Sequence, residues 1–533
     1  MNKESYNPIW PETLIFLGAG ATASIGMPTT GKIAELLYKL SSSDGNLASR
    51  VESVFKDKTF QKEIGDFFEQ LNDIENNNQT GKYSKNLRNN YSWATLKSLI
   101  SICPGESEKD FKLLDLFNII DLHLNNGQGF HTPNAEGEKV FIDLNSLRKA
   151  RNTLKLLINL IFAYKYQLAL KNNRNTIDKY AQFADILAEM MLDEGEYFSS
   201  QNYSLDKRKF YLFSYAVISM NWDPLFLWYI FNAHKKKNDS PLKIGESGVE
   251  LKLFNDFAHF LGVRAVDSKE QKIWYPLNET VVQRLNDPEY QNRRVRVGKY
   301  YFPHGSLNWR NCPKCGKLTS YLGSEWDIYS ESLFPPQLVK NLSFSQPRSK
   351  EEFNDFKVDL VDSLQCQYCG KLTSISDSPM IMQSSFKLNH SSFIEEIQRD
   401  MRIAIEEAKH ILLFGYSLPE DDVIYRSLLA ARKKYSDQEN IPYCSVATGR
   451  IADAPNKWLK GRELEEFLNK NPESSFAEVV KIAFDIFGKD NVRGYACGIP
   501  AVFMDKYGGH ASKARIKELL YPKKIFSNNR VER

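Results

Sequence analysis

Cysteine is scarce in this chain, with seven residues among 533. The number is odd, and four of the seven form two tight pairs, Cys312 with Cys315 and Cys366 with Cys369. This pattern excludes an extracellular scaffold held together by disulfides, which needs many paired cysteines in a short chain. It indicates reduced thiols, a metal site and a cytoplasmic location.

Long apolar runs are also missing. The best candidate for a membrane span is the stretch 210–231, but Asn221, Asp223 and Pro224 interrupt its middle, and such residues are costly in lipid. The apolar run 14–17 near the N-terminus is too short for the apolar region of a signal peptide. We therefore expect no membrane segment and a cytoplasmic protein.

Charge of one sign does not predominate, because 70 Lys and Arg residues stand against 66 Asp and Glu residues, a net charge of +4. So small an excess does not indicate nucleic acid as a partner. The excess is concentrated in residues 511–533, where seven basic residues stand against two acidic ones. Ordinary hydrophobic (42%) and charged (26%) fractions exclude a disordered or collagen-like chain. The length allows three or four domain-sized units, or one large domain with insertions.

Strand and helix patterns alternate along most of the chain. Short apolar runs predict strands, and apolar residues at helical spacing predict helices. The region from about 40 to 205 is expected to be mostly helical. Strands that alternate with helices favour an α/β fold with a parallel, doubly wound sheet. The predicted strands are 12–17, 211–218, 300–304, 410–414, 443–447 and 501–504, and the main predicted helices are 33–40, 64–71, 154–170 and 393–409.

Three short motifs carry polar or glycine residues at the ends of predicted strands. The run 18–22, Gly-Ala-Gly-Ala-Thr, lies between a strand and a helix, where glycines let the backbone approach a phosphate; a tightly packed turn is the alternative. Asn221 and Asp223 follow the strand 211–218 and are either site residues or a turn and helix cap before Pro224. His304 stands at the end of the strand 300–304, and a lone histidine is more often structural than catalytic.

The two cysteine pairs form CxxC knuckles, each followed by glycine. Cys312, Cys315, Cys366 and Cys369 would present four thiolates to one tetrahedral zinc ion, a structural site with no open position for water. Unrelated free thiols are the alternative. A zinc ribbon can also contact nucleic acid, and the basic run 293–299 lies nearby, but we expect that run to form a solvated edge strand.

The run GAGATASIGMP at 18–28 resembles the first nucleotide-binding motif of the sirtuin family, with Thr22 in place of its first serine and Met27 in place of an isoleucine. The segment 219–223 (SMNWD) is similar to the sirtuin Thr-Gln-Asn-x-Asp, and His304-Gly305 to the sirtuin His-Gly. The segment 410–418 (HILLFGYSL) is similar to the late sirtuin strand with its Gly-x-Ser. These motifs and the zinc pairs follow one another in sirtuin order.

The resemblance implies a Rossmann-like sheet of the sirtuin type over residues 1–430, with a helical insertion at about 40–205 and a four-cysteine zinc module at about 310–378. Residues 431–533 would complete the fold or mediate partner contacts. It also implies that NAD is the substrate. The implied catalytic residues are His304, Asn221 and Asp223, and the implied NAD-binding residues are Gly18, Ala19, Gly20, Thr22, Pro28, Gly415 and Ser417.

Two departures from protein-deacylating sirtuins narrow the expected activity. Thr29-Thr30-Gly31 replaces their Asp-Phe-Arg, and the segment 386–388 does not reproduce their peptide-binding Phe-Gly-Glu. These departures resemble the bacterial sirtuin-like NADases of anti-phage defence, which hydrolyse NAD to nicotinamide and ADP-ribose. The alternatives are an NAD-dependent protein deacylase and a module that senses nucleotides or binds nucleic acid without turnover.

An enzyme that drains NAD without a second substrate needs control, and the sequence offers the helical block and the C-terminal segment with its basic tail for that purpose. The alternative for both, and for the helices an equally good one, is a structural cover for the sheet. We expect a homo-oligomer or a complex with a second defence protein, such as a HerA-like ATPase or an Argonaute-like protein. Direct nucleic-acid binding is not expected.

Overall fold

The computed structural model describes residues 11–523 apart from short gaps. The gaps are 43–46, 59–60, 62–64, 66–88, 106, 135–136, 201–210, 246–247, 259–260, 265–272, 275–292, 322–326, 331–363, 387–390, 421 and 436–440.

A nine-stranded sheet forms the centre of the molecule. Its strands, in spatial order, are β16 (Leu459–Lys460), β17 (Val492–Tyr495), β15 (Tyr443–Ala447), β14 (His410–Phe414), β1 (Thr13–Leu17), β4 (Leu212–Ser219), β9 (Arg293–Tyr301), β6 (Val249–Asp256) and β5 (Leu242–Ile244). The pairs from β17 to β6 are all parallel, and only the outer strands β16 and β5 run antiparallel to their neighbours. The prediction of an α/β fold with a mostly parallel sheet is therefore confirmed.

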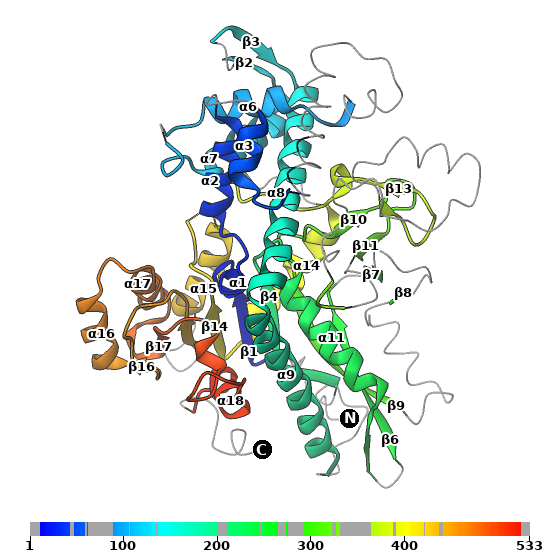
Figure 1. Ribbon diagram of the computed structural model, residues 1–533. Helices are drawn as coiled ribbons and strands as arrows, with labels where there is room; N and C mark the ends of the chain where they lie inside the picture. The colour runs from blue at the N-terminus through cyan, green and yellow to red at the C-terminus, as the bar shows by residue number, and fades with distance from the viewer. Residues whose placement is uncertain are drawn as a thin grey trace.

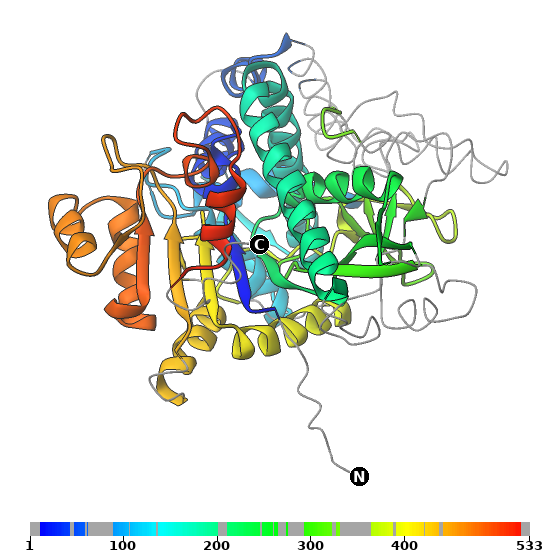
Figure 2. The ribbon, with the colours of Figure 1, turned by 90° about the horizontal axis from the view of Figure 1, so that it is seen from below.

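Helices cover both faces of this sheet (Figure 2). On one face lie α9 (Arg174–Ser200), α11 (Leu225–Asp239) and α18 (Lys513–Leu520), and on the other lie α14 (Ser392–Glu407), α15 (Val423–Tyr435) and α17 (Ser475–Phe487). Because both faces are covered, inner strands such as β1, β14 and β15 are buried at every residue and are mostly apolar.

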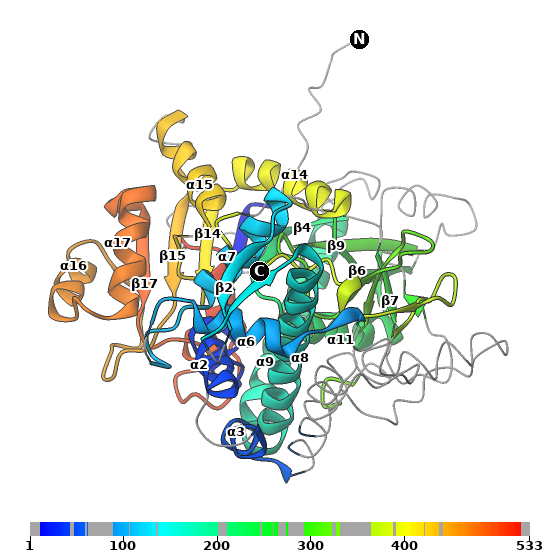
Figure 3. The same cartoon turned by 90° about the horizontal axis from the view of Figure 1, so that it is seen from above.

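A block of helices lies beyond the carboxyl ends of the parallel strands (Figures 1 and 3). It contains α2 (Thr30–Ser41), α3 (Leu47–Val54), α6 (Trp93–Ser101), α7 (Leu113–Asn126) and α8 (Leu144–Asn172), together with the hairpin β2 (Phe130–Pro133) and β3 (Lys139–Ile142). The helix predicted at 154–170 is part of α8, which begins earlier because Asp143 accepts a hydrogen bond from the backbone N–H of Ser146. The helix predicted at 64–71 lies almost entirely outside the described residues.

Two strand predictions need correction. The run 501–504 forms a short 3-10 helix, η5 (Ala501–Phe503), because Pro500 lacks a backbone N–H for a sheet ladder and a single turn buries Val502 and Phe503 equally well. The strand predicted at 300–304 is the end of β9, which stops at Tyr301, and His304 lies in the loop that follows.

The prediction of a solvated edge strand at 293–299 is wrong. β9 lies between β4 and β6, inside the sheet. Arg296 is 0% exposed and donates to Glu194 of α9 at 2.5 Å, and Lys299 donates to Asp400 of α14 at 2.8 Å. These cations are neutralised by carboxylates from helices on opposite faces of the sheet.

The C-terminal segment shares the sheet and covers α9. β15, β16 and β17 belong to the nine-stranded sheet, and α18 contacts both α9 and β14. Lys513 of the basic tail forms an ion pair with Asp193 at 2.6 Å, while residues 524–533 lie outside the described part of the chain. Within the described residues, no helix has the length and apolar character needed to cross a bilayer.

Candidate functional site

Four loops meet where the central parallel strands end. They follow β1, β4, β14 and β15 and contain the runs 18–19, 220–223, 415–417 and 448–449. β1 has β4 as its neighbour on one side and β14 on the other. The strands that come next in the chain lie on the β4 side and the later ones on the β14 side, so the strand order reverses at β1. Such a reversal opens a crevice at the carboxyl edge of the sheet, where α/β proteins bind ligands.

The glycines of the first and third loops interlock. Gly20 N donates to Gly415 O at 2.9 Å. A Cβ atom at Gly18 would lie 2.5 Å from Gly415 O, and one at Gly415, whose φ is +66°, would lie 2.0 Å from Ala21 N. The close approach of the two loops therefore requires these glycines, as the packing interpretation of the motif expects. The same packing places both loops side by side at the edge of the crevice.

A cavity of about 480 Å³ fills this crevice, a volume in the range of small-molecule sites. The helical block covers it, since Ile33 of α2, Phe117 of α7 and Phe162 of α8 are part of its wall. Eight of the residues predicted from the sequence line it: Gly18, Ala19, Gly20, Pro28, Asn221, Asp223, Gly415 and Ser417.

Asn221 and Asp223 are held by buried hydrogen bonds. Asn221 Nδ2 donates to Gly18 O at 3.0 Å, which joins the loops after β4 and β1. Thr22 does not line the cavity, but its hydroxyl donates to Asp223 Oδ2 at 3.2 Å. Asp223 Oδ1 also accepts from the N–H of Leu225, the first residue of α11, at 3.2 Å, although the N-cap residue of that helix is Pro224.

Burial raises the pKa of Asp223 to about 6, although the hydrogen bonds from Leu225 and Thr22 lower it. A buried carboxyl group that titrates near neutral pH beside a cavity is a common feature of functional sites.

His304 lies outside the lining of this cavity. Its side chain is 1% exposed, and its Nε2 lies 3.5 Å from Oδ1 of the buried Asp422. Asp422 Oδ2 accepts from the hydroxyl of Tyr416 at 2.6 Å, and Tyr416 does line the cavity. The carboxylate of Asp422 therefore connects the imidazole to the wall of the cavity.

Trp222 also connects the His304 loop to the cavity. Its backbone O accepts from Ser306 Oγ and from Leu307 N, both at 2.9 Å. Its indole N–H donates to Ile381 O at 3.0 Å, and Ile381 N donates to His304 O at 2.9 Å. The loop after β9 is thus fixed against the loop after β4.

Sequence reasoning missed several residues of this region. Tyr416, Gln383, Thr448 and Gly449 line the cavity, and Asp422 lies behind it. The acidic run 420–422, which begins three residues after Ser417 of the Gly-Tyr-Ser motif, is the one signal that could have indicated Asp422.

The four cysteines of the CxxC knuckles come together as predicted. Cys312 and Cys315 lie in the turn between β10 (Trp309–Asn311) and β11 (Leu318–Tyr321), and Cys366 and Cys369 in the turn between β12 (Leu364–Gln365) and β13 (Leu372–Thr373). Both turns have the same hydrogen bonds, from Gly316 N to Cys312 O and from Gly370 N to Cys366 O.

The positions of the thiols fit zinc. All four sulfur atoms lie within 4.8 Å of one another, with Cys312 to Cys369 at 3.5 Å and Cys315 to Cys366 at 3.7 Å. A tetrahedral zinc ion with Zn–S bonds of about 2.3 Å separates its sulfur ligands by about 3.8 Å. The cluster therefore has the donor set and the spacing of a structural zinc site.

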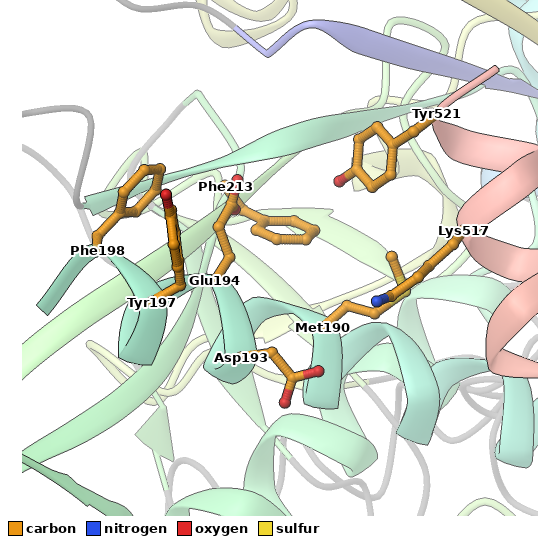
Figure 4. A pocket seen from close by; sticks show the side chains of 8 residues that line it. All are labelled: Met190, Asp193, Glu194, Tyr197, Phe198, Phe213, Lys517 and Tyr521. Carbon is orange, nitrogen blue, oxygen red and sulfur yellow. The ribbon is translucent and has the colours of Figure 1, made fainter. Parts of the chain in front are cut away.

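A smaller cavity of about 100 Å³ lies between α9, β4 and the C-terminal segment (Figure 4). Phe213, Phe198 and Met190 form its apolar wall, and Tyr521 closes one side. Glu194 lines it but is already paired with Arg296. None of the residues predicted from the sequence belongs to it.

Comparisons of the chain with protein-family models and with curated proteins find no match.

Proposed function

We propose that this protein binds NAD in the cavity at the carboxyl edge of the sheet and hydrolyses it to nicotinamide and ADP-ribose. The observation that carries the proposal is the convergence of eight motif residues, from three separate segments of the chain, on one cavity at the reversal of strand order. The resemblance of these segments to sirtuin motifs, in the same order, supports NAD as the ligand. The wider role, NAD depletion in anti-phage defence, rests on that resemblance alone.

The glycine loops would hold the phosphates and ribose of NAD. Gly18, Ala19 and Gly20 line the cavity, and Gly18 and Gly20 lack the side chains that would push away the loop of Gly415; Ser417 offers a hydroxyl on that neighbouring loop. Pro28 fixes the backbone at the entrance to α2. This arrangement positions the substrate, and positioning alone can supply a large part of the rate enhancement.

Asn221 and Asp223 would act at the nicotinamide end. Hydrolysis breaks the bond between the ribose C1′ and the nicotinamide nitrogen, forms a bond from C1′ to a water oxygen, and releases a proton. The carboxylate of Asp223 can stabilise positive charge that develops on the ribose, and the amide of Asn221 can orient the ribose hydroxyls or the water. Since Asp223 titrates at about 6, its charged form predominates at neutral pH.

His304 remains the proposed base, and Asp422 would orient it. The contact of 3.5 Å between His304 Nε2 and Asp422 Oδ1 resembles the pairing of a catalytic imidazole with a carboxylate. Because His304 does not line the cavity and its Nε2 faces Asp422, a proton from the reacting water would reach its Nδ1 through further water. The zinc site is structural in this proposal and takes no part in the reaction.

The test is to incubate the purified chain with NAD, with and without an acetyl-lysine peptide, and to identify the products by chromatography. We expect nicotinamide and ADP-ribose in equal amounts whether or not the peptide is present. Products that require the peptide and carry its acetyl group would identify a deacylase. Binding of NAD without any product would identify a nucleotide-sensing module.

A further inference from the structure

A second cavity of about 480 Å³ lies farther along α7, toward its C-terminal end, than the proposed NAD site. It is lined by α7, by α8, and by Ser376, residues 378–381 and Ser391, which precede α14. Three basic side chains from α8 face it, Arg148, Arg151 and Lys155. Their spacing of three and four residues places them on one face of the helix.

We propose that this second cavity is a binding site for a small molecule that carries a phosphate group. The proposal is independent of NAD hydrolysis, because none of its basic or hydroxyl residues belongs to the cavity at the carboxyl edge of the sheet.

The strongest feature of the site is a buried lysine. Lys155 is 2% exposed, and its Nζ donates one hydrogen bond, to Ser378 O at 2.8 Å. An ammonium group has three donors, and burial of a charged lysine is costly unless an anion compensates it. Burial and the nearby cations Arg151 and Arg310 keep the pKa of Lys155 well below its usual range, while Asp121 and Asp377 oppose this.

Hydroxyl groups on the opposite wall complete the set of donors. Ser378 is 4% exposed, and its hydroxyl has no hydrogen-bond partner within the described residues. The buried hydroxyl of Ser391, at the N-terminal end of α14, is in the same situation. A buried hydroxyl without a partner is rare, because its desolvation is not repaid. A helix N-terminus also favours an anion through its free N–H groups.

The carboxylates near the site do not cancel its positive charge. Asp121 is already engaged by Arg151 at 3.3 Å and by the hydroxyl of Ser384 at 2.7 Å. Asp377 accepts a hydrogen bond from the backbone N–H of Ser374. The exposed Arg148 has no ion pair among the described residues, so it is available to a ligand.

The size and the donors favour a phosphomonoester. Its three terminal oxygens accept several hydrogen bonds at once, which matches the amine of Lys155, whose protonated form a bound anion would favour, a guanidinium group and two hydroxyls that line one space. The cavity is larger than a phosphate group requires, which leaves room for an organic part. One wall is shared with the NAD site, because Ile381 lines this cavity and accepts from the indole of Trp222.

The experiment is titration calorimetry of the full chain with inorganic phosphate, ribose 5-phosphate and ribose at constant ionic strength. We expect ribose 5-phosphate to bind more tightly than inorganic phosphate, and ribose not to bind. Arg148→Ala and Ser378→Ala should each weaken ribose 5-phosphate binding about tenfold or more. Arg148 is exposed, so its variant should fold normally even if Ser378→Ala does not.

Lys149→Ala is the matched control, because it removes the same charge from the adjacent position of α8 without lining the cavity. Its binding should equal that of the wild type. The proposal is overturned if neither phosphate compound binds the wild type, or if ribose binds as tightly as ribose 5-phosphate. It is also overturned if Arg148→Ala binds ribose 5-phosphate as tightly as the wild type does, or if Lys149→Ala weakens that binding as strongly as Arg148→Ala. Binding of inorganic phosphate alone would overturn the phosphomonoester as the ligand.

Discussion

Asp223 should make the stability of the folded chain fall as the pH rises through about 6. Its pKa is raised from an ordinary value of 3.8 to about 6, so the folded state favours the protonated carboxyl. The stabilising effect is complete below about pH 4 and is lost above pH 6. At roughly 1.4 kcal/mol per pKa unit, the raised pKa corresponds to about 3 kcal/mol.

The perturbation that isolates this effect is Asp223→Asn, which keeps the shape of the side chain and stays neutral. Relative to the wild type, the free energy of unfolding of the variant should increase by about 3 kcal/mol between pH 4 and pH 7. Urea denaturation of both proteins across that range measures the difference. Nicotinamide release by the wild type should rise over the same range, because the proposal assigns activity to the carboxylate.

Asp143→Asn provides a control of opposite sign. The N–H of Ser146 lowers the pKa of Asp143, so this carboxylate stabilises the folded state above its ordinary pKa and stops doing so as the pH falls. The Asp143→Asn variant should therefore lose stability relative to the wild type as the pH rises through the acidic range to about 4, and the difference should then stay constant up to pH 7. A difference between Asp223→Asn and the wild type that does not change with pH would refute the reasoning about Asp223.

Three further predictions concern other parts of the structure. Cys312→Ser should lose the bound zinc and melt at a lower temperature, since a structural zinc contributes on the order of 10 kcal/mol. The control Cys497→Ser, whose cysteine lies outside the cluster, should retain its zinc in metal analysis. Glu194→Ala should lower the free energy of unfolding by about 3–5 kcal/mol because it removes the carboxylate that pairs with the buried Arg296. The double variant with Arg296→Met should regain most of that free energy in urea denaturation, and no recovery would contradict this explanation. Asp422→Asn should lower the rate of NAD cleavage without changing the zinc content, and an unchanged rate would exclude it as the residue that orients the proposed base.

The sequence was sufficient to predict the centre of the sheet. β1, β14 and β15 are buried on both faces, so apolar residues predominate along their whole length and their bounds follow from the residues to within one position. The run 501–504 shows the limit of that rule. A short apolar run after a proline buries its side chains equally well as a helical turn, and only tertiary contacts decide between the two.

The charged strand β9 could not be predicted from local pattern. Arg296 and Lys299 lie inside the sheet because Glu194 and Asp400, from distant helices, neutralise them. Nothing within the run 293–299 indicates those partners, so the run has the pattern of an exposed edge.

The residues of the candidate site likewise include some that a local motif predicts and some that only tertiary contacts reveal. Residues in loops directly after apolar strands, such as Asn221 and Gly415, were predicted because parallel strands end at one edge. Thr22 and His304 were predicted too, but the structure places both outside the cavity lining. Asp422 was missed because its role depends on contacts between loops rather than on a local motif.

The most direct test of the central claim is the rate of nicotinamide release from NAD by the purified wild type, Asn221→Ala and Asn145→Ala. Asn221 lines the proposed NAD cavity, while Asn145 is exposed on α8 and serves as the matched control. We expect the wild type and Asn145→Ala to release nicotinamide at equal rates and Asn221→Ala, folded and with its zinc, to be slower by about 10²-fold or more. Equal rates in all three proteins, or no release by the wild type in any condition, would contradict the account.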